Sequence, residues 1–310
     1  MSVDGLIREG LARPQKQLPS LLLYDALGSQ LFEAITQLPE YGVAAAGLRL
    51  VERHRHDIVA GEGPLEIVEL GPGAGGKARL FVEALREKQR HVRFVGVDIS
   101  AQALCDCRRT LRDVPGVSVV CIEDTYLEGL QRAANVREDG ARQLVLFLGS
   151  NLSNFERAET LAFLHGVRQR LRPKDALLLA TDLDKEPDRL VPAYDDALGV
   201  TAAFNRNVLL RLNREWGADF PLCAFSHQAR WNGPQRRIEM HLVAHRACDV
   251  NLRGLKMSLR MSAGESLWTE SSHRFSLGEL RAWGQDAGFV VAHQWVDAEW
   301  PFAQTLLTVP

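Results

Sequence analysis

The chain has 310 residues, a length that suits two domains or one α/β domain with a sizeable insertion. Its composition is that of an ordinary globular protein, with 46% hydrophobic and 25% charged residues. The 37 Lys and Arg against 39 Asp and Glu leave a formal net charge of −2. This balance excludes a broad electrostatic attraction to nucleic acid or to an anionic membrane.

Targeting, membrane and metal signals are also missing from the sequence. No apolar run approaches the roughly 18 residues of a spanning helix, and the opening residues lack the apolar core of a signal peptide. The five cysteines form no C-x-x-C pair and predict neither a disulfide framework nor a zinc site. We therefore expect a cytoplasmic, monomeric protein with a small-molecule ligand and no metal.

The first stretch of the chain, to about Leu38, shows helical spacing of its apolar residues. From about residue 65, near-continuous apolar runs alternate with helical stretches such as 77–89 and 157–171. The apolar runs are residues 65–70, 92–97, 117–122, 144–149 and 176–181. Runs of this kind are typical of strands that are covered on both faces by helices. The alternation predicts an α/β fold with a doubly wound, mostly parallel sheet.

The alternation stops near Asp184, and a different pattern follows. Helices are predicted at 189–204, 206–217 and 277–288. Strands are predicted at 223–231 and 236–244, joined by a turn, and two closing strands at 289–296 and 302–309. One of the two closing strands is expected to be antiparallel. We interpret the chain as a parallel-sheet domain (45–185 plus 276–310) interrupted by an α+β domain (1–44 plus 186–275).

A glycine-rich loop, residues 69–76 (ELGPGAGG), follows the first predicted strand. Glycines permit positive φ and a close approach of ligand to backbone, and open α/β sheets bind ligands at the carboxyl ends of their strands. The loop satisfies the dinucleotide pattern G-x-G-x-x-G. With Glu69 it is also similar to the E/D-x-G-x-G loop of S-adenosylmethionine-dependent methyltransferases. Asp98, at the end of the second strand, could accept ribose hydroxyls in either case, so the spacing leaves both cofactors open.

Two further features favour S-adenosylmethionine (SAM) as the cofactor. Glu123-Asp124 follows the third strand, where SAM enzymes of this class usually place an acid against the adenine amino group. A polar loop at 149–155 follows the fourth strand and could meet a methyl acceptor. The alternative is that the glycines form only a tight turn and the acids face solvent. The predicted cofactor residues are Glu69, Gly71, Gly73, Gly75, Lys77, Asp98, Asp124 and Gly149.

Six segments in unbroken order carry a family resemblance: 22–41, 68–81, 144–155, 178–209, 237–244 and 264–275. Together they resemble the histidine Nα-methyltransferases of ergothioneine biosynthesis. The segment AYDDALGVTAAFNRN at 193–207 is specific, because generic helix formation does not explain it. The resemblance implies a class I, Rossmann-like methyltransferase domain with a second, substrate-binding domain. It also implies an enzyme that uses SAM to methylate the α-amino group of L-histidine, up to the trimethylated product hercynine.

For the amino-acid end of the substrate, the resemblance implies roles for four residues. Tyr24 and Tyr41 match tyrosines that line the pocket, Asn154 matches an asparagine at the amino and carboxylate end, and Tyr194 matches a carboxylate ligand. Tyr24 and Asn154 are our candidates for orienting the free amine during catalysis. Taken alone, the tyrosines could be interface aromatics, and Asn154 could cap a helix that starts near Phe155.

For the imidazole end, the resemblance implies that Met240 packs beside the ring and that Glu270 and Ser272 bond to its nitrogens. This fits the chemistry, since a neutral imidazole has one N–H donor and one acceptor nitrogen. By itself, Met240 would be core filler, and Glu270, in a polar Thr-Glu-Ser-Ser run, would be exposed.

The chain departs from the family after Tyr41. A Tyr-Pro-Thr-Arg-Thr-Glu-like tract that borders the family's active site is here Gly42-Val43-Ala44-Ala45-Ala46-Gly47, without polar side chains. The acceptor could therefore be another amino acid or a histidine derivative. Two alternatives from other classes are a nicotinamide-dependent dehydrogenase and a non-catalytic scaffold that has kept the fold.

Overall fold

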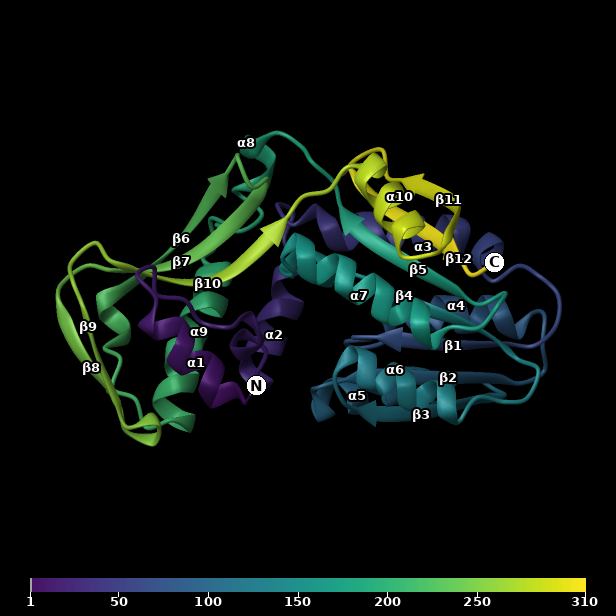
Figure 1. Cartoon of the computed structure of the whole chain (residues 1–310), viewed down its shortest axis with the longest axis horizontal. Helices are drawn as coiled ribbons and strands as arrows, with labels where there is room; N and C mark the ends of the chain where they lie inside the picture. The colour runs from purple at the N-terminus through teal and green to yellow at the C-terminus, as the bar shows by residue number, and fades with distance from the viewer. Residues whose placement is uncertain (1) are drawn as a thin grey trace. The chain divides into compact units, whose positions relative to one another are not determined.

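A seven-stranded sheet with the order β11-β12-β5-β4-β1-β2-β3 dominates the computed structural model, which describes residues 2–310 (Figure 1). Its strands are β1 (Leu65–Leu70), β2 (Val92–Asp98), β3 (Val117–Glu123), β4 (Arg142–Phe147), β5 (Ala176–Asp182), β11 (Val290–Val296) and β12 (Phe302–Thr308). Strands β1 to β5 are mutually parallel, and β12 runs antiparallel to both of its neighbours. The predicted doubly wound, mostly parallel sheet is confirmed, including one antiparallel closing strand.

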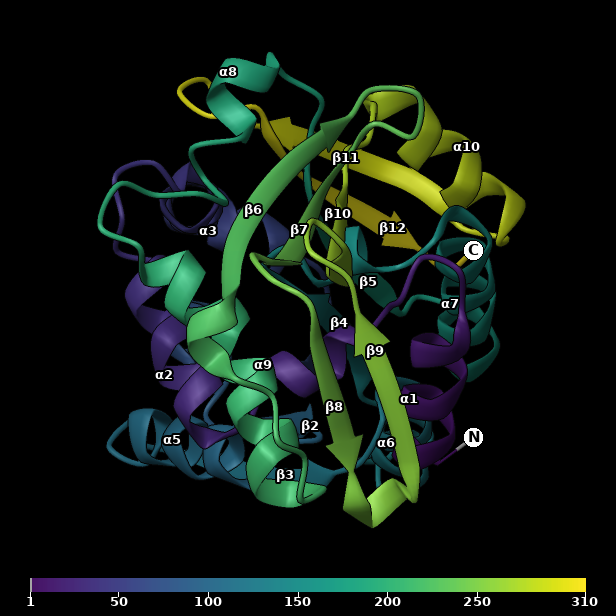
Figure 2. The same cartoon turned by 90° about the vertical axis from the view of Figure 1, so that its left-hand side faces the viewer.

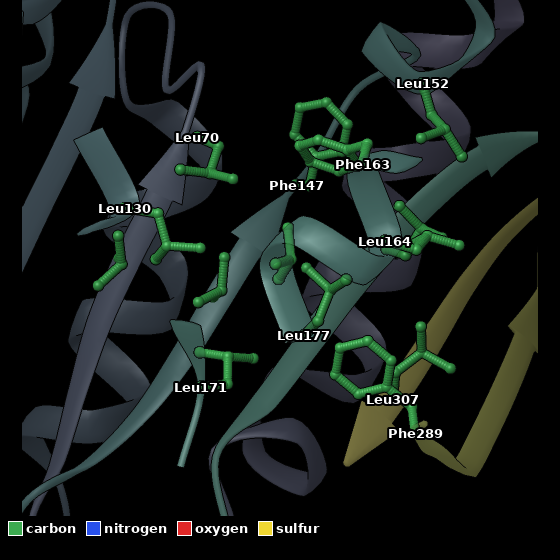
Figure 3. Packing of buried hydrophobic residues seen from close by; sticks show 14 of the residues in the cluster. Leu70, Leu130, Phe147, Leu152, Phe163, Leu164, Leu171, Leu177, Phe289 and Leu307 are labelled. Carbon is green, nitrogen blue, oxygen red and sulfur yellow. The ribbon is translucent and has the colours of Figure 1, made fainter. Parts of the chain in front are cut away.

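Helices flank this sheet on both faces, as expected for strands whose side chains are apolar on both sides. They are α3 (Gly42–Ile58), α4 (Gly76–Arg86), α5 (Ala101–Leu111), α6 (Tyr126–Asn135), α7 (Arg157–Arg170) and α10 (Leu277–Asp286). Figure 3 shows part of the core that α6 and α7 form against the strands, with the rings of Phe147 and Phe163 packed together. This core packs the helices against parallel strands, whose carboxyl ends therefore lie at one edge of the sheet.

The chain divides into two compact units. The sheet unit consists of Val43–Asp184 and Arg274–Pro310, and contains the seven-stranded sheet. The insertion unit consists of the chain up to Gly42 together with Lys185–His273. The unit boundaries therefore fall at 42/43, 184/185 and 273/274, where the sequence had suggested 44/45, 185/186 and 275/276.

The insertion unit contains a three-stranded antiparallel sheet of order β10-β7-β6 and a two-stranded ribbon, β8-β9 (Figure 2). Its elements are α1 (Val3–Ala12), η1 (Ser20–Leu23), α2 (Ala26–Ile35), α8 (Pro187–Leu190), α9 (Val200–Glu215), η3 (Leu222–Ala224), β6 (Phe225–Asn232), β7 (Arg237–Ala244), β8 (Cys248–Leu252), η4 (Arg253–Leu255), β9 (Met257–Met261) and β10 (Ser266–His273). Helix α9 packs on β6 and β7, and α2 packs on α9.

The helical character predicted for the stretch to about Leu38 is confirmed, as three short helices, because Pro14 and Pro19 lie between α1 and η1 and cannot continue a helix. The helix prediction for 189–217 was wrong in part. Of the two helices expected at 189–217, the first is only the four-residue α8. The second begins earlier than expected, at Val200, after Gly199 with φ of 76°. Strands β8, β9 and β10 were not predicted.

A buried ion pair ties the ends of α6, β4 and β5 together at the amino-terminal edge of the sheet. Asp175 has no exposed surface and accepts two hydrogen bonds from Arg137, at 2.6 and 2.8 Å. The same carboxylate accepts the backbone N–H groups of Gln143 and Arg172, each at 2.8 Å. All four bonds depend on the charge of one side chain.

Replacing Asp175 with Asn should destabilise the protein by about 3–5 kcal/mol, because Arg137 would remain buried without its counter-charge. The matched control is Asp106→Asn, which removes the charge from an exposed pair with Arg109 and should cost less than about 1 kcal/mol. Urea unfolding of both variants measures the difference. Equal shifts in midpoint would contradict the assignment.

Candidate active site

The glycine loop between β1 and α4 has the backbone geometry of a ligand cradle. Gly71, Gly73 and Gly75 all have positive φ, at 73°, 53° and 79°. A Cβ atom on Gly75 would lie only 3.1 Å from the Cα atom of Cys107, so a side chain at Gly75 would be excluded by space as well as by conformation. Helix α4 begins at Gly76, and its first backbone N–H groups face this loop.

Glu69, the last residue but one of β1, is a buried acid with unused bonding capacity. It is 2% exposed, and its Oε2 atom accepts no hydrogen bond. Burial raises the pKa of Glu69 to about 8, with Lys77 opposing the shift and Asp98 adding to it. A buried acceptor of this kind is suited to a ligand that brings hydrogen-bond donors or positive charge.

Two more carboxylates follow the neighbouring strands β2 and β3. Burial raises the pKa of Asp98, although backbone N–H donors, including that of Ser100 at 2.9 Å, partly oppose the rise. The backbone N–H of Asp124 donates to the Asp98 carbonyl at 3.1 Å, so the two residues are adjacent. The Asp124 carboxylate accepts from the Thr125 N–H at 2.9 Å and from Arg132 at 3.1 Å. Acceptors that surround a glycine loop suit a ligand carrying ammonium and hydroxyl donors.

The loop after β4 supplies the remaining predicted residues of the sheet unit. Gly149 has φ of 83°, and no atom lies within 4 Å of a Cβ built there. Asn154 ends the short helix η2 (Asn151–Asn154). It does not cap the next helix, because α7 begins at Arg157 and has Glu156 as its cap. The capping alternative for Asn154 was therefore wrong.

Sequence reasoning missed two polar side chains beside the glycine loop. Relative to a Cβ built on Gly71, the Asn151 amide nitrogen lies at 3.0 Å and the Tyr126 hydroxyl at 3.5 Å. Burial raises the pKa of Tyr126, so this hydroxyl stays protonated. Tyr126 is the first residue of α6. Its sequence context is that of an ordinary helix residue, and only the folded chain places it beside the glycine loop.

In the insertion unit, five aromatic rings form a continuous aromatic cluster. Its members are Tyr24, Phe32, Tyr41, Tyr194 and Phe204. The Tyr24 ring contacts Phe32 and Phe204 edge-on, with centroids 5.7 and 5.5 Å apart, and Tyr41 contacts Tyr194 at 6.1 Å. All three predicted tyrosines are therefore connected. Phe32 and Phe204, which join them, were missed because isolated phenylalanines at helical spacing resemble core residues.

The polar residues predicted to hold an imidazole lie on β10 and its neighbours. The Tyr194 and Ser272 hydroxyls share a hydrogen bond of 2.7 Å. Glu270 on β10 is directly opposite Met240 on β7. Glu270 is only 8% exposed, so the expectation of an exposed polar run was wrong.

A β-bulge explains how this polar run becomes buried. The register of β10 against β7 shifts between Trp268 and Glu270, which leaves Thr269 as an extra residue. Thr269 bonds to Asn205 of α9. The bulge places Thr269 and Glu270 on the same side of the strand, whereas simple alternation would separate them.

Tyr24 is held in place by the residue that follows it. Asp25 caps α2 and accepts hydrogen bonds from the Gly28 N–H, Asn207 and Arg214, each at 2.7 Å. Burial alone would raise the pKa of Asp25, but these donors lower it below its usual value. A charged anchor therefore fixes the chain between η1 and α2.

Residues 2–310 contain no group of three or more His, Cys, Asp or Glu side chains arranged to hold a metal ion. Across the same residues, no helix combines the length and the apolar character needed to span a bilayer.

The comparison with known protein families decides the classification. Residues 3–309 match the model of the family described as histidine-specific methyltransferase, SAM-dependent. The chain belongs to this family. SAM dependence is a property of this family, and the predicted resemblance is confirmed.

Individual relatives agree with this family assignment. The chain is 39% identical over 301 residues to histidine N-alpha-methyltransferase of Mycolicibacterium smegmatis, covering 97% of this chain and 92% of that protein. It is 34% identical over 203 residues to ergothioneine biosynthesis protein 1 of Neurospora crassa, covering 64% of this chain and 23% of that protein. Among solved structures, a putative methyltransferase from Thermobifida fusca matches with a TM-score of 0.52 at 11% identity, covering 94% of this chain and 92% of that chain. This last likeness concerns the fold alone.

The tract Gly42–Gly47, where the family resemblance implied polar side chains, forms the start of α3. Val43, Ala46 and Gly47 are buried in the sheet unit. The Gly47 carbonyl accepts a hydrogen bond from Gln304 at 3.2 Å, and a Cβ at Gly47 would lie 3.5 Å from the Phe302 ring and 3.7 Å from the Lys77 ammonium. In this family member the tract is therefore an apolar, closely packed helix start.

The raised pKa of Glu69 predicts a pH-dependent stability. A carboxyl with a folded-state pKa near 8 and an ordinary unfolded value stabilises the fold below about pH 4.5, and this contribution is lost as the pH rises to 8. Wild type should therefore lose stability relative to Glu69→Gln across this window, by at most about 1.4 kcal/mol per pH unit.

Urea unfolding of the ligand-free proteins between pH 5 and 9 measures this difference. Glu83→Gln, on an exposed side chain of α4, is the control and should show no such trend. If the difference between wild type and Glu69→Gln were independent of pH, Glu69 would ionise normally in the folded protein.

Proposed function

We propose that the protein transfers methyl groups from SAM to the α-amino nitrogen of L-histidine, up to the trimethylated product hercynine. One observation carries the proposal within this family: the bulged strand β10 buries Glu270 and Ser272 beside Tyr194 and Met240. The name and the 39% identity of the Mycolicibacterium smegmatis relative support it. The Neurospora crassa relative supports a place in ergothioneine biosynthesis.

The proposed ring site matches an imidazole in bonding capacity. Glu270 would accept the ring N–H, and Ser272 would donate to the other ring nitrogen. The 2.7 Å hydrogen bond between the Tyr194 and Ser272 hydroxyls would hold Ser272 beside the ring. Met240, opposite Glu270, would pack on the ring. An amino acid without a ring N–H would not supply the hydrogen bond to Glu270, which gives a basis for selectivity.

The proposed cofactor site is the carboxyl edge of β1, β2 and β3. SAM supplies a methyl group on a positively charged sulfur when it is bound. Glu69 and Asp98 would accept its ammonium and hydroxyl donors, since Glu69 is buried with an unused acceptor atom and Asp98 is a half-buried carboxyl. Gly71, Gly73, Gly75 and Gly149 would allow its close approach, with Lys77 and Asp124 completing the set.

In methyl transfer, the protein would align the amine with the methyl group and allow the removal of one proton from the amine. An α-ammonium group has no lone pair, but model α-amino pKa values near 8 mean that a small reduction frees the amine at neutral pH. Tyr24 and Asn154 would orient that amine after its proton is lost to water or to Tyr24, and Tyr41 and Tyr194 would hold the rest of the backbone end. Correct alignment of the reacting atoms supplies much of the rate in such displacements. Repeated transfer requires the amine to rotate between rounds.

Mass spectrometry of a panel of amino acids and histidine derivatives, each incubated with enzyme and SAM, tests the proposed activity. L-histidine should gain one, two and three methyl units, and other amino acids should gain none. Preferential methylation of another panel member would reassign the acceptor, and no gain on any compound would refute the activity. Calorimetry with S-adenosylhomocysteine and with NAD distinguishes the SAM site from the dinucleotide alternative, for which only NAD would bind.

Replacing Glu270 with Ala should raise the KM for histidine by about 10- to 100-fold, the range expected for a lost hydrogen bond to a charged group. Binding of S-adenosylhomocysteine should change less than about twofold, because the proposed cofactor residues all lie in the sheet unit. Ser258→Ala, on the exposed face of β9, is the control and should leave both values unchanged. Equal losses in both measurements would show that Glu270 does not contact the acceptor.

A further inference from the structure

We propose that His227 is a positioning residue for the histidine substrate: held neutral by Asn205, it fixes Tyr194 at the ring site. This inference rests on the proposed function, because it concerns the same site. It assigns a role to Asn205 in the segment 193–207. Of that segment, the proposed mechanism uses only Tyr194.

A chain of buried hydrogen bonds connects α9 to Tyr194. The amide nitrogen of Asn205 lies 2.9 Å from Nδ1 of His227 and 3.2 Å from the His241 carbonyl oxygen. On the other side of its ring, His227 Nε2 lies 2.7 Å from the Tyr194 carbonyl oxygen. Asn205 is fully buried, and the His227 side chain is 1% exposed. Neither side chain can exchange these partners for bulk water.

The partners of Asn205 decide where the proton of His227 lies. A carbonyl oxygen can only accept, so the bond to His241 requires that the Asn205 NH2 group, and not its oxygen, points this way. The Asn205 oxygen faces the Thr269 hydroxyl at 2.6 Å, which agrees with that orientation. His227 Nδ1 must therefore accept from the amide, and the ring proton is on Nε2, where it donates to Tyr194. The other tautomer would lose both bonds.

The same asparagine contacts both sides of the proposed ring site. Through His227 it holds the backbone of Tyr194, whose hydroxyl bonds to Ser272. Through Thr269 it holds the bulge of β10, immediately before Glu270. One buried side chain thus sets the position of the tyrosine relative to the strand that carries the acid and the serine.

Tyr194 requires such support because of the segment in which it lies. Residues 191–199 form turns and bends between α8 and α9 without a regular hydrogen-bond ladder. A leucine would fill the volume of His227, but it would leave the Tyr194 carbonyl and the Asn205 amide without their partner. The polar ring is therefore explained by its two directed bonds, whereas packing alone would favour an apolar residue.

Protonation of His227 would break the arrangement. A second ring N–H would face the Asn205 amide hydrogens, and burial already lowers the pKa of His227. The charged groups that face the ring are Asp195, whose carboxylate lies 3.9 Å from Nε2, Asp196 and Arg206. The aspartates favour the protonated ring, and burial and Arg206 oppose it. Histidine affinity should therefore include a component that is lost as the pH falls below the ordinary range of imidazole titration.

Two substitutions at His227 test the inference. His227→Leu keeps the volume and removes both bonds, whereas His227→Gln retains an N–H donor that can reach the Tyr194 carbonyl and cannot titrate. Calorimetry with L-histidine in the presence of S-adenosylhomocysteine should show at least about tenfold weaker binding for the Leu variant and less than about threefold for the Gln variant. Between pH 7 and 4.5, the Gln variant should lose less histidine affinity than wild type.

The controls separate a local effect from general destabilisation. His165→Ala, on an exposed histidine of α7, should bind histidine as wild type does. S-adenosylhomocysteine alone should bind all variants within about twofold. Equal loss of both ligands in His227→Leu, or unchanged histidine affinity, would overturn the inference while leaving the proposed function intact. A wild-type protein that binds S-adenosylhomocysteine but not histidine would overturn the proposed function and this inference with it.

A measurement on the wild-type protein covers the case in which His227→Leu does not fold. Nitrogen-15 NMR of protein labelled at histidine reports the tautomer of each ring, and His227→Gln identifies the relevant signal by its loss. His227 should be neutral with its proton on Nε2 at pH 7. A proton on Nδ1, or a charged ring at this pH, would refute the assignment.

Discussion

The need to satisfy polar side chains in buried positions governs both halves of this protein. In the sheet unit, β1 is buried along its whole length, and Glu69 near its end has an oxygen that accepts no hydrogen bond. In the insertion unit, the fully buried Asn205 has partners on every side, and those partners lead to Tyr194 and to the bulge before Glu270. The Glu69 oxygen that accepts no hydrogen bond lies at the edge of the sheet where we propose that the ligand binds. The hydrogen-bonded Asn205 belongs to the network that we propose supports the ring site.

The two units perform different physical tasks. The seven-stranded sheet, with apolar helices on both faces, holds glycines and acids at strand ends, where the loops are short and their geometry is determined by the core. The smaller unit builds its proposed site from an aromatic cluster and from one irregular strand. This division agrees with a family in which a common methyl donor is combined with a particular acceptor. The start of α3, after Tyr41, is apolar in this chain, where the family resemblance implied polar side chains.

Sequence and structure agree best where the signal is local. The predicted runs for β1 to β5 lie within two residues of the observed strands, because strands buried on both faces leave continuous apolar runs. Agreement is poorest at 189–217, where Gly199 moves the helix start and Asn205 lies inside α9 and not at a break. The apolar residues of the turn segment 191–199, such as Tyr194, have the spacing of a helix. Periodicity therefore predicted a helix where the chain forms turns.

The sequence by itself determined the doubly wound sheet, the glycine loop with Glu69 and Asp98, and the family to which the chain belongs. These follow from periodicity, from glycines next to a strand and from segments in a fixed order. Only the tertiary structure decided that Glu270 is buried, since a bulge at Thr269 overrides simple alternation. It alone placed His227 between Asn205 and Tyr194, residues that lie 22 and 33 positions away in the chain. Contacts across such separations depend on how the elements pack, and no local pattern encodes them.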